Sequence, residues 1–145
     1  MKPIEELQRE IVSDFQNIGD SFDRYAYLVE LGCALPPMPE QNKTDERLVE
    51  GCQSRVWLMI ECEDNCFRFC ADSDTLVVKG ILYLFQQLFC GQPPADVARA
   101  NVTFLKDAFV METFESARQK GIGYVLNALQ SAAADLAKEE PPLGD

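Results

Sequence analysis

The first apolar residues of the chain recur every three or four positions. They are Ile4, Leu7, Ile11, Phe15 and Ile18. This spacing predicts a helix with one apolar face. Gly19 interrupts the pattern, and Asp20 or Ser21 can cap a second helix. The apolar residues of that second helix are Phe22, Tyr25, Leu28 and Val29. Gly32 favours the left-handed conformation that ends helices, so we expect the second helix to end there.

No regular spacing follows between Cys33 and Gly51. The run Pro36–Pro39 is rich in proline, which forbids helix and favours extended backbone. A loop of this length is uncommon in a compact domain and is usually functional or disordered. Near its end, Leu48 and Val49 favour a short strand.

Two short runs of aromatic and β-branched residues come next. The runs are Arg55–Cys62 and Cys66–Ala71, and Glu63–Asn65 lies between them as a turn. This pattern predicts a β-hairpin. In the second run, alternation places Phe67 and Phe69 on one face and Cys66, Arg68 and Cys70 on the other.

The rest of the chain has helical spacing. A helix over residues 75–90 is apolar nearly all round, which indicates a central buried helix, and Ser73 or Asp74 can cap it. Shorter helices are expected over 94–99 and within 102–110, and a last helix over 117–138. No repeat or linker divides the chain, so we expect one domain over residues 1–138. Residues 139–145 are acidic and contain prolines, and we expect a flexible tail there.

Composition and charge narrow the possible partners. Of the 145 residues, 47% are apolar and 26% charged, which is ordinary globular composition, and the net charge is −11. A field of that sign repels nucleic acid and anionic membranes, so neither is expected as a partner. The first residues lack the apolar stretch of a signal peptide, and Leu76–Phe89 is too short and too polar to span a bilayer. We therefore expect a cytoplasmic protein with mostly reduced cysteines.

Cysteine is the main candidate for a reactive residue, because the chain contains no histidine. The six cysteines are Cys33, Cys52, Cys62, Cys66, Cys70 and Cys90. There is no C-x-x-C pair, but three of them form a C-x₃-C-x₃-C pattern in the hairpin. Three thiolates could hold zinc or an iron–sulfur cluster, although this spacing is not a familiar ligand spacing. The alternative is that these thiols, like Cys33 and Cys90, are small apolar side chains.

Cys52 stands apart from the others because it lies between the long loop and the first strand. Gly51 before it permits backbone angles that other residues resist and leaves space around the sulfur. A loop residue held by a rigid hairpin is well placed to react. A tight turn with an inert buried thiol is the alternative.

The segment Glu50–Trp57 (EGCQSRVW) resembles the GCQSxVW signature of the SufE family of sulfur acceptors. Three further segments are similar to family motifs in the same order. They are Leu31–Pro39, Asp72–Gly80 (DSD…G) and Ser116–Gly121. The resemblance extends from about Ile4 to Ala137. It implies an α+β fold in which helices pack on a small antiparallel sheet of about three strands, a fold shared with scaffold proteins of iron–sulfur cluster assembly.

The resemblance also implies a function and a site. A desulfurase that depends on pyridoxal phosphate carries sulfur as a cysteine persulfide, and Cys52, which aligns with the family's acceptor cysteine, takes the outer sulfur. The Cys52 persulfide is then passed to an iron–sulfur cluster scaffold, and the desulfurase is stimulated. The chain would be a carrier and activator rather than a free-standing enzyme. It would hold no permanent cofactor, only the transient persulfide on Cys52.

Several residues near Cys52 are candidates for supporting roles. Thiolate attack on a sulfur–sulfur bond depends on the local field, and with no histidine we propose Arg118 as the nearby cation, with a solvated surface arginine as the alternative. Gln53, Ser54 and Asp74, with Gly51, are expected to hold the loop or meet the partner, or else to serve as turn and cap residues. We also hypothesise that Cys52 turns inward under the long loop until a partner binds.

Two other functions stay open from the sequence. The first is an iron–sulfur scaffold or metal-binding protein that uses Cys52 together with hairpin cysteines. The second is an interaction module with an unreactive thiol.

Overall fold

The N-terminal apolar spacing forms two helices, α1 (Ile4–Gln16) and α2 (Ser21–Ala34). The carboxylate of Asp20 accepts a hydrogen bond of 2.9 Å from the N–H of Asp23, so the predicted cap is confirmed. The structure is a computed structural model and describes residues 2–139. The predicted flexible tail falls outside the described residues except for Glu139.

The predicted hairpin is confirmed as β1 (Val56–Glu63) and β2 (Cys66–Ser73), paired antiparallel from Val56 opposite Ser73 to Glu63 opposite Cys66. Asp64 and Asn65 have φ of 53° and 59°, which suits a two-residue turn. The short strand expected at Leu48 and Val49 is a single bridge between Leu48 and Trp57. The chain leaves the strand there because Gly51 turns it at φ 88°, so the described residues contain a sheet of two strands.

The remaining helices are α3 (Leu76–Phe89), α4 (Pro94–Arg99), α5 (Phe104–Asp107) and α6 (Ser116–Lys138). Three short 3₁₀ turns complete the secondary structure: η1 (Glu40–Asn42), η2 (Asp45–Arg47) and η3 (Met111–Thr113). The prediction that Ser73 or Asp74 is the N-cap of α3 is wrong. Thr75 is the N-cap, because Ser73 still belongs to β2 and the Asp74 carboxylate accepts a bond from Arg55 instead.

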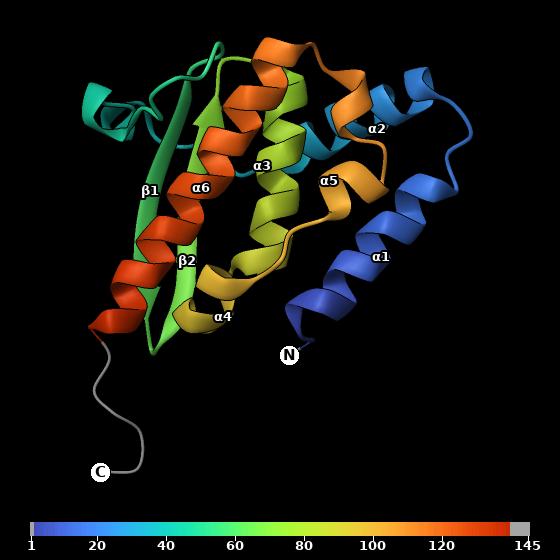
Figure 1. The fold of residues 1–145 in the computed structure, drawn as a ribbon. Coiled ribbons are helices and arrows are strands. Elements are labelled where there is room, and N and C mark those ends of the chain that lie inside the picture. Colours follow the sequence, from blue (N-terminus) through green and yellow to red (C-terminus); the bar gives the residue numbers. More distant parts are fainter. Residues whose placement is uncertain (1, 140–145) are drawn as a thin grey trace.

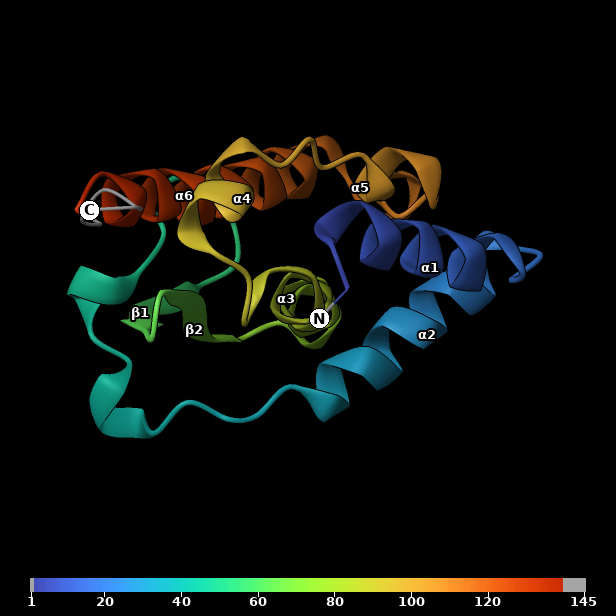
Figure 2. The same ribbon diagram turned by 90° about the horizontal axis from the view of Figure 1, so that it is seen from below.

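The elements form an α+β arrangement around α3. Figure 1 shows α6 lying along the hairpin, with α3 beside β2. In Figure 2 the hairpin and α3 lie beneath α6, and α1 and α2 lie on the side of α3 away from the hairpin. Nine residues of α3 are buried, which confirms the expected central helix. Among residues 2–139, no helix has both the length and the apolar character that crossing a bilayer requires.

Two glycines set the distance between α2 and α3. The prediction that Gly32 ends α2 is wrong, because α2 continues to Ala34. Gly32 faces α3 instead, where a Cβ would overlap the carbonyl oxygen of Leu76. Gly80 faces α2 in the same way, and a Cβ there would overlap the carbonyl oxygen of Leu28. Both glycines are therefore required by the close approach of the two backbones.

We expect Gly80→Ala to destabilise the protein by about 3 kcal/mol, because the added methyl meets backbone that cannot move aside. Gly123→Ala is the matched control, since a Cβ at Gly123 in α6 meets nothing within 4 Å. That control should stabilise the protein by about 0.5–1 kcal/mol through helix propensity. Urea unfolding measures both. Equal effects of the two substitutions would show that the helix crossing is not tightly packed.

Candidate functional site

The segment Gly51–Ser54 leads into β1, and its cysteine faces the start of α6. The Cys52 thiol donates to the carbonyl oxygen of Gly121 over 3.4 Å. A Cβ on Gly121 would lie 3.4 Å from the Cα and 3.6 Å from the Sγ of Cys52. The absence of a side chain at Gly121 therefore lets the cysteine lie directly on the helix backbone.

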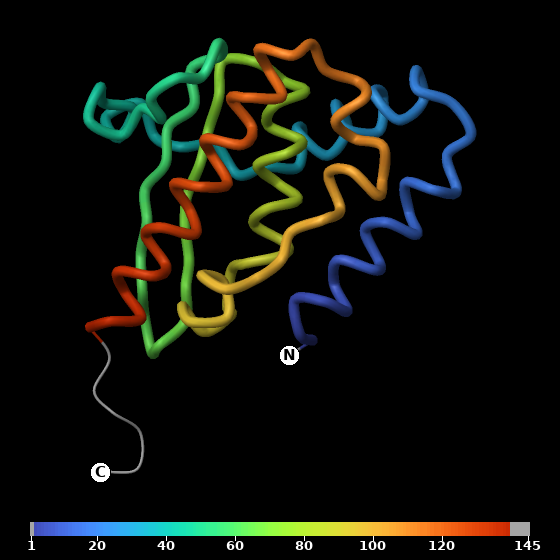
Figure 3. Tube along the Cα trace, viewed as in Figure 1, coloured from blue at the N-terminus to red at the C-terminus, as the bar shows by residue number. Residues whose placement is uncertain are grey.

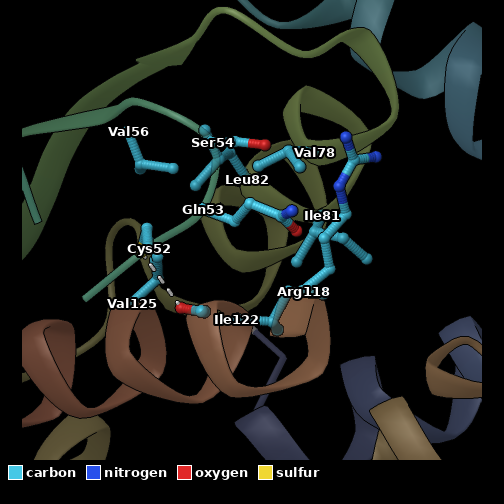
Figure 4. Close-up of a pocket in the computed structure, with 11 residues that line it drawn as sticks. Cys52, Gln53, Ser54, Val56, Val78, Ile81, Leu82, Arg118, Ile122 and Val125 are labelled. Carbon is cyan, nitrogen blue, oxygen red and sulfur yellow. Dashed lines mark hydrogen bonds between the residues drawn. The ribbon is translucent and has the colours of Figure 1, made fainter. Parts of the chain in front are cut away.

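A small, mainly apolar cavity adjoins Cys52. Its volume is about 20 Å³, which is space for little more than one water-sized group. Figure 4 shows the side chains around it, which come from the loop, β1, α3 and α6. The apolar ones are Val56, Val78, Ile81, Leu82, Ile122 and Val125.

Burial changes the acidity of the cysteine. Cys52 is half-buried, and this burial raises the pKa of its thiol above the ordinary value. A thiol is a much weaker nucleophile than a thiolate. In this conformation Cys52 is therefore sheltered and poorly reactive near neutral pH.

Arg118 lines the same cavity but does not act on the Cys52 thiol in this conformation. Figure 4 shows its guanidinium at the other end of the cavity from Cys52, with Gln53 between them. No cation among residues 2–139 offsets the effect of burial on the pKa of Cys52. The role of Arg118 stays a prediction for a state in which the cysteine has moved.

Polar contacts hold the end of the Cys52 segment against the start of α3. The Asp74 carboxylate accepts a bond of 3.1 Å from the N–H of Arg55, and the Ser73 hydroxyl donates to the carbonyl of Arg55 over 2.7 Å. The Thr75 hydroxyl lies 2.9 Å from the hydroxyl of Ser54. Ser54 and Asp74 both take part in these bonds, whereas the exposed side chain of Gln53 does not. Their role in holding the loop or meeting a partner stays a prediction.

The long loop lies on the other face of the hairpin, so the shelter of Cys52 differs from the expectation. Figure 3, viewed as in Figure 1, traces the loop from the end of α2 around the β1 edge to the start of β1. Met38 is buried there, and its N–H donates to Asp72 over 3.2 Å. Lys43 lies over the ring of Trp57 and forms an ion pair with Asp72. Cys52 does turn inward, but α6 and α3 cover it rather than this loop.

Asp72 belongs to the DSD…G segment that resembles a family motif, but the sequence analysis did not single it out for a role. Its carboxylate is 3% exposed and lies 3.2 Å from Lys43 Nζ and 3.4 Å from Lys79 Nζ. Burial opposes its ionisation, but bonds from the N–H groups of Ser73 and Met38 and the two lysines outweigh burial and lower the pKa of Asp72. The available signal was the Asp72–Gly80 segment itself, which resembles a family motif.

Tyr124 is a second residue that the sequence analysis did not single out for a role. A Cβ built on Gly51 would lie 2.7 Å from Cε2 of the Tyr124 ring, so the ring packs directly on the Gly51 backbone. No sequence signal indicated this contact, because it joins two residues that lie far apart along the chain.

The hairpin cysteines do not converge. In the antiparallel register Cys62 faces one side of the hairpin, while Cys66 and Cys70 face the other. Cys66 and Cys70 are also about 13 Å apart along the strand, judged from the strand rise. Cys52 precedes β1 at the end away from the turn. Within residues 2–139 no group of three or more potential ligand side chains is placed to hold a metal ion.

The fold and the loop cysteine define a class of small α+β proteins, and comparison with known proteins identifies the family. Residues 9–133 match the family model SufE, described as an Fe-S metabolism associated domain, so the chain belongs to the SufE family. An uncharacterised SufE-like protein of Rhizobium meliloti is 31% identical over 129 residues, which cover 86% of this chain and 92% of that protein. Another, from Rhizobium etli, is 32% identical over 130 residues, covering 86% and 87%.

A solved structure supports the fold. The solution structure of a hypothetical protein from Thermus thermophilus matches with a TM-score of 0.76 at 20% identity, covering 97% of this chain and all of that one. Together with the helices and hairpin described above, this match confirms the α+β fold. The family assignment places the chain in iron–sulfur metabolism.

We expect iodoacetamide to alkylate Cys52 in the folded protein more slowly than the exposed Cys62, because Cys52 is covered and its pKa is raised. Peptide mass spectrometry over a pH series measures both rates. The rate at Cys52 should rise with a midpoint above about 8.5, the ordinary thiol value. Equal rates at the two cysteines would contradict the sheltered conformation.

We expect Asp72→Asn to lower the free energy of unfolding by about 2 kcal/mol near neutral pH, because two lysines lose a buried carboxylate. Since the folded-state pKa of Asp72 is lowered, its contribution is fully present above about pH 4 and is lost as the pH falls through the folded value. The difference from wild type should therefore shrink in acid. Asp64→Asn, in the exposed turn, is the control. Urea unfolding that shows the same loss for both variants would contradict this role.

Proposed function

We propose that this chain accepts persulfide sulfur from a cysteine desulfurase dependent on pyridoxal phosphate, passes it to an iron–sulfur cluster scaffold, and stimulates the desulfurase. Cys52 is the acceptor. The observation that carries the proposal is a cysteine in the GCQS segment of a SufE-family chain, lying at a small apolar cavity. The chain acts as a covalent carrier, with no permanent cofactor, in the reducing cytoplasm.

The transfer is a thiolate exchange at sulfur and needs no oxidant. The Cys52 thiol first loses its proton to solvent or a partner base. The thiolate then attacks the outer sulfur of the desulfurase persulfide, a new sulfur–sulfur bond forms at Cys52, and the desulfurase cysteine leaves as a thiolate. A thiolate of the scaffold repeats the exchange and returns the Cys52 thiolate.

The cavity supports a carrier role. A persulfide adds one sulfur atom beyond Sγ, and the space of about 20 Å³ beside Cys52 is apolar on most sides. Water and other thiols reach a persulfide in such a place poorly. Figure 4 shows that the cavity lies between the cysteine and α3, where that sulfur would be covered.

The same shelter requires movement before transfer. A covered thiol with a raised pKa is a poor nucleophile, so Cys52 turns outward when the desulfurase binds. Ser54 and Asp74 stay with the start of α3 as the fixed end of that movement. Arg118, at the other end of the cavity, is the proposed cation that stabilises the thiolate or the persulfide once Cys52 has moved. Gly51 and Gln53 meet the partner.

Mass spectrometry after incubation with an active cysteine desulfurase and cysteine, without reductant, tests the proposal. We expect one additional sulfur on the peptide that contains Cys52. Cys52→Ser should abolish both this sulfur and the stimulation of the desulfurase, whereas the matched control Cys62→Ser, at an exposed hairpin thiol, should keep both.

Two outcomes would overturn the proposal. An unmodified Cys52 beside an active desulfurase would remove the carrier role. Sulfur on Cys62, Cys66 or Cys70 instead would move the chemistry to the hairpin.

A further inference from the structure

One turn of α6 contacts the Cys52 segment at two points. The carbonyl of Gly121 accepts the Cys52 thiol over 3.4 Å, and three residues later the ring of Tyr124 packs on Gly51. Residues three apart on a helix lie on the same side, so the two contacts act on the segment together.

The contact between Tyr124 and Gly51 is specific to a residue without a side chain. Gly51 has φ 88°, and a Cβ there would lie 2.7 Å and 2.8 Å from two ring carbons of Tyr124. The ring therefore occupies the space that a side chain at position 51 would need. The lack of space would exclude a side chain at position 51 even if the backbone angle allowed one.

Hydrogen bonds anchor the chain before and after Gly51 and Cys52, whereas these two residues themselves contact α6. Before them, the N–H of Val49 donates to Val56, and after them, Arg55 and Ser54 are bonded to the start of α3. Between these anchors the thiol of Cys52 is a weak donor. The three atoms nearest to a Cβ built on Gly51 all belong to the ring of Tyr124.

The ring also has space to move. Tyr124 is 48% exposed and lines a surface groove of about 390 Å³ that is formed by α6, β1 and residues 46–50. The apolar residues of this groove are Leu48, Val49, Leu58, Ile60 and Ala128. A partly exposed side chain changes rotamer quickly, so the ring can leave Gly51 for the groove.

We propose that Tyr124 is a positioning residue that holds Gly51 against α6 and so keeps Cys52 turned inward. Its departure from Gly51 accompanies the outward movement of Cys52. This inference rests on the proposed function for its purpose, because a carrier needs its cysteine both sheltered and releasable. The contact itself concerns the free protein and can be tested without any partner.

The test measures how fast iodoacetamide alkylates Cys52 in the free protein, by peptide mass spectrometry. Tyr124→Ala should raise the rate about three- to tenfold, as expected for the loss of one aromatic contact. Tyr124→Phe keeps the ring and should react like wild type. Tyr25→Ala, which removes a similarly exposed tyrosine (42%) on α2, should also react like wild type.

Two results would overturn the inference. One is an unchanged alkylation rate in Tyr124→Ala. The other is an equal rise at the partly buried Cys90, because that would indicate general loosening of the protein, which urea unfolding would register as well. Failure of the desulfurase to load Cys52 would remove the proposed function but would leave these rates, and the role of Tyr124, as measured.

Discussion

At Gly32 and Gly80 the backbones of α2 and α3 approach so closely that no side chain fits between them. This contact sets the distance between α2 and α3, and α3 is the helix around which the other elements pack. The Cys52 segment is bonded to the residues just before α3, through Asp74 and Thr75. The position of the candidate acceptor therefore depends on a helix crossing that lies outside the site.

The long loop and the Cys52 segment are held on opposite faces of the hairpin. On one face, the long loop is tied down by Asp72, whose carboxylate joins Met38 and Lys43 to Lys79 of α3. On the other, the Cys52 segment rests on α6 through Gly121 and Tyr124. The first contact is charged and buried, whereas the second consists of a weak thiol bond and one exposed ring. The cysteine is thus the part of the region that can move at least cost, since an exposed contact is easier to break than a buried ion pair.

The sequence signals that predicted structure correctly are local ones. The helical spacing of α1, the cap at Asp20, the hairpin and its turn follow from neighbours within a few residues, and these predictions were confirmed. The prediction that Gly32 ends α2 was wrong because a glycine near the end of a helical pattern can either end the helix or allow close contact with another helix. The expected third strand became one bridge because Gly51 turns the chain away.

The residues along the chain were enough to predict the main helices, the hairpin and their order. They were also enough to recognise the family signature at Glu50–Trp57 and to single out Cys52. These depend on residue type and spacing, which can be read along the chain. Other features could be learned only from the packing of the fold. Helix α6 rather than the long loop covers Cys52, and Arg118 lies across the cavity from it. Asp72 binds the long loop, and the ring of Tyr124 packs on Gly51. Those facts join residues far apart in sequence, and the packing of whole elements, rather than any local preference, brings such residues together.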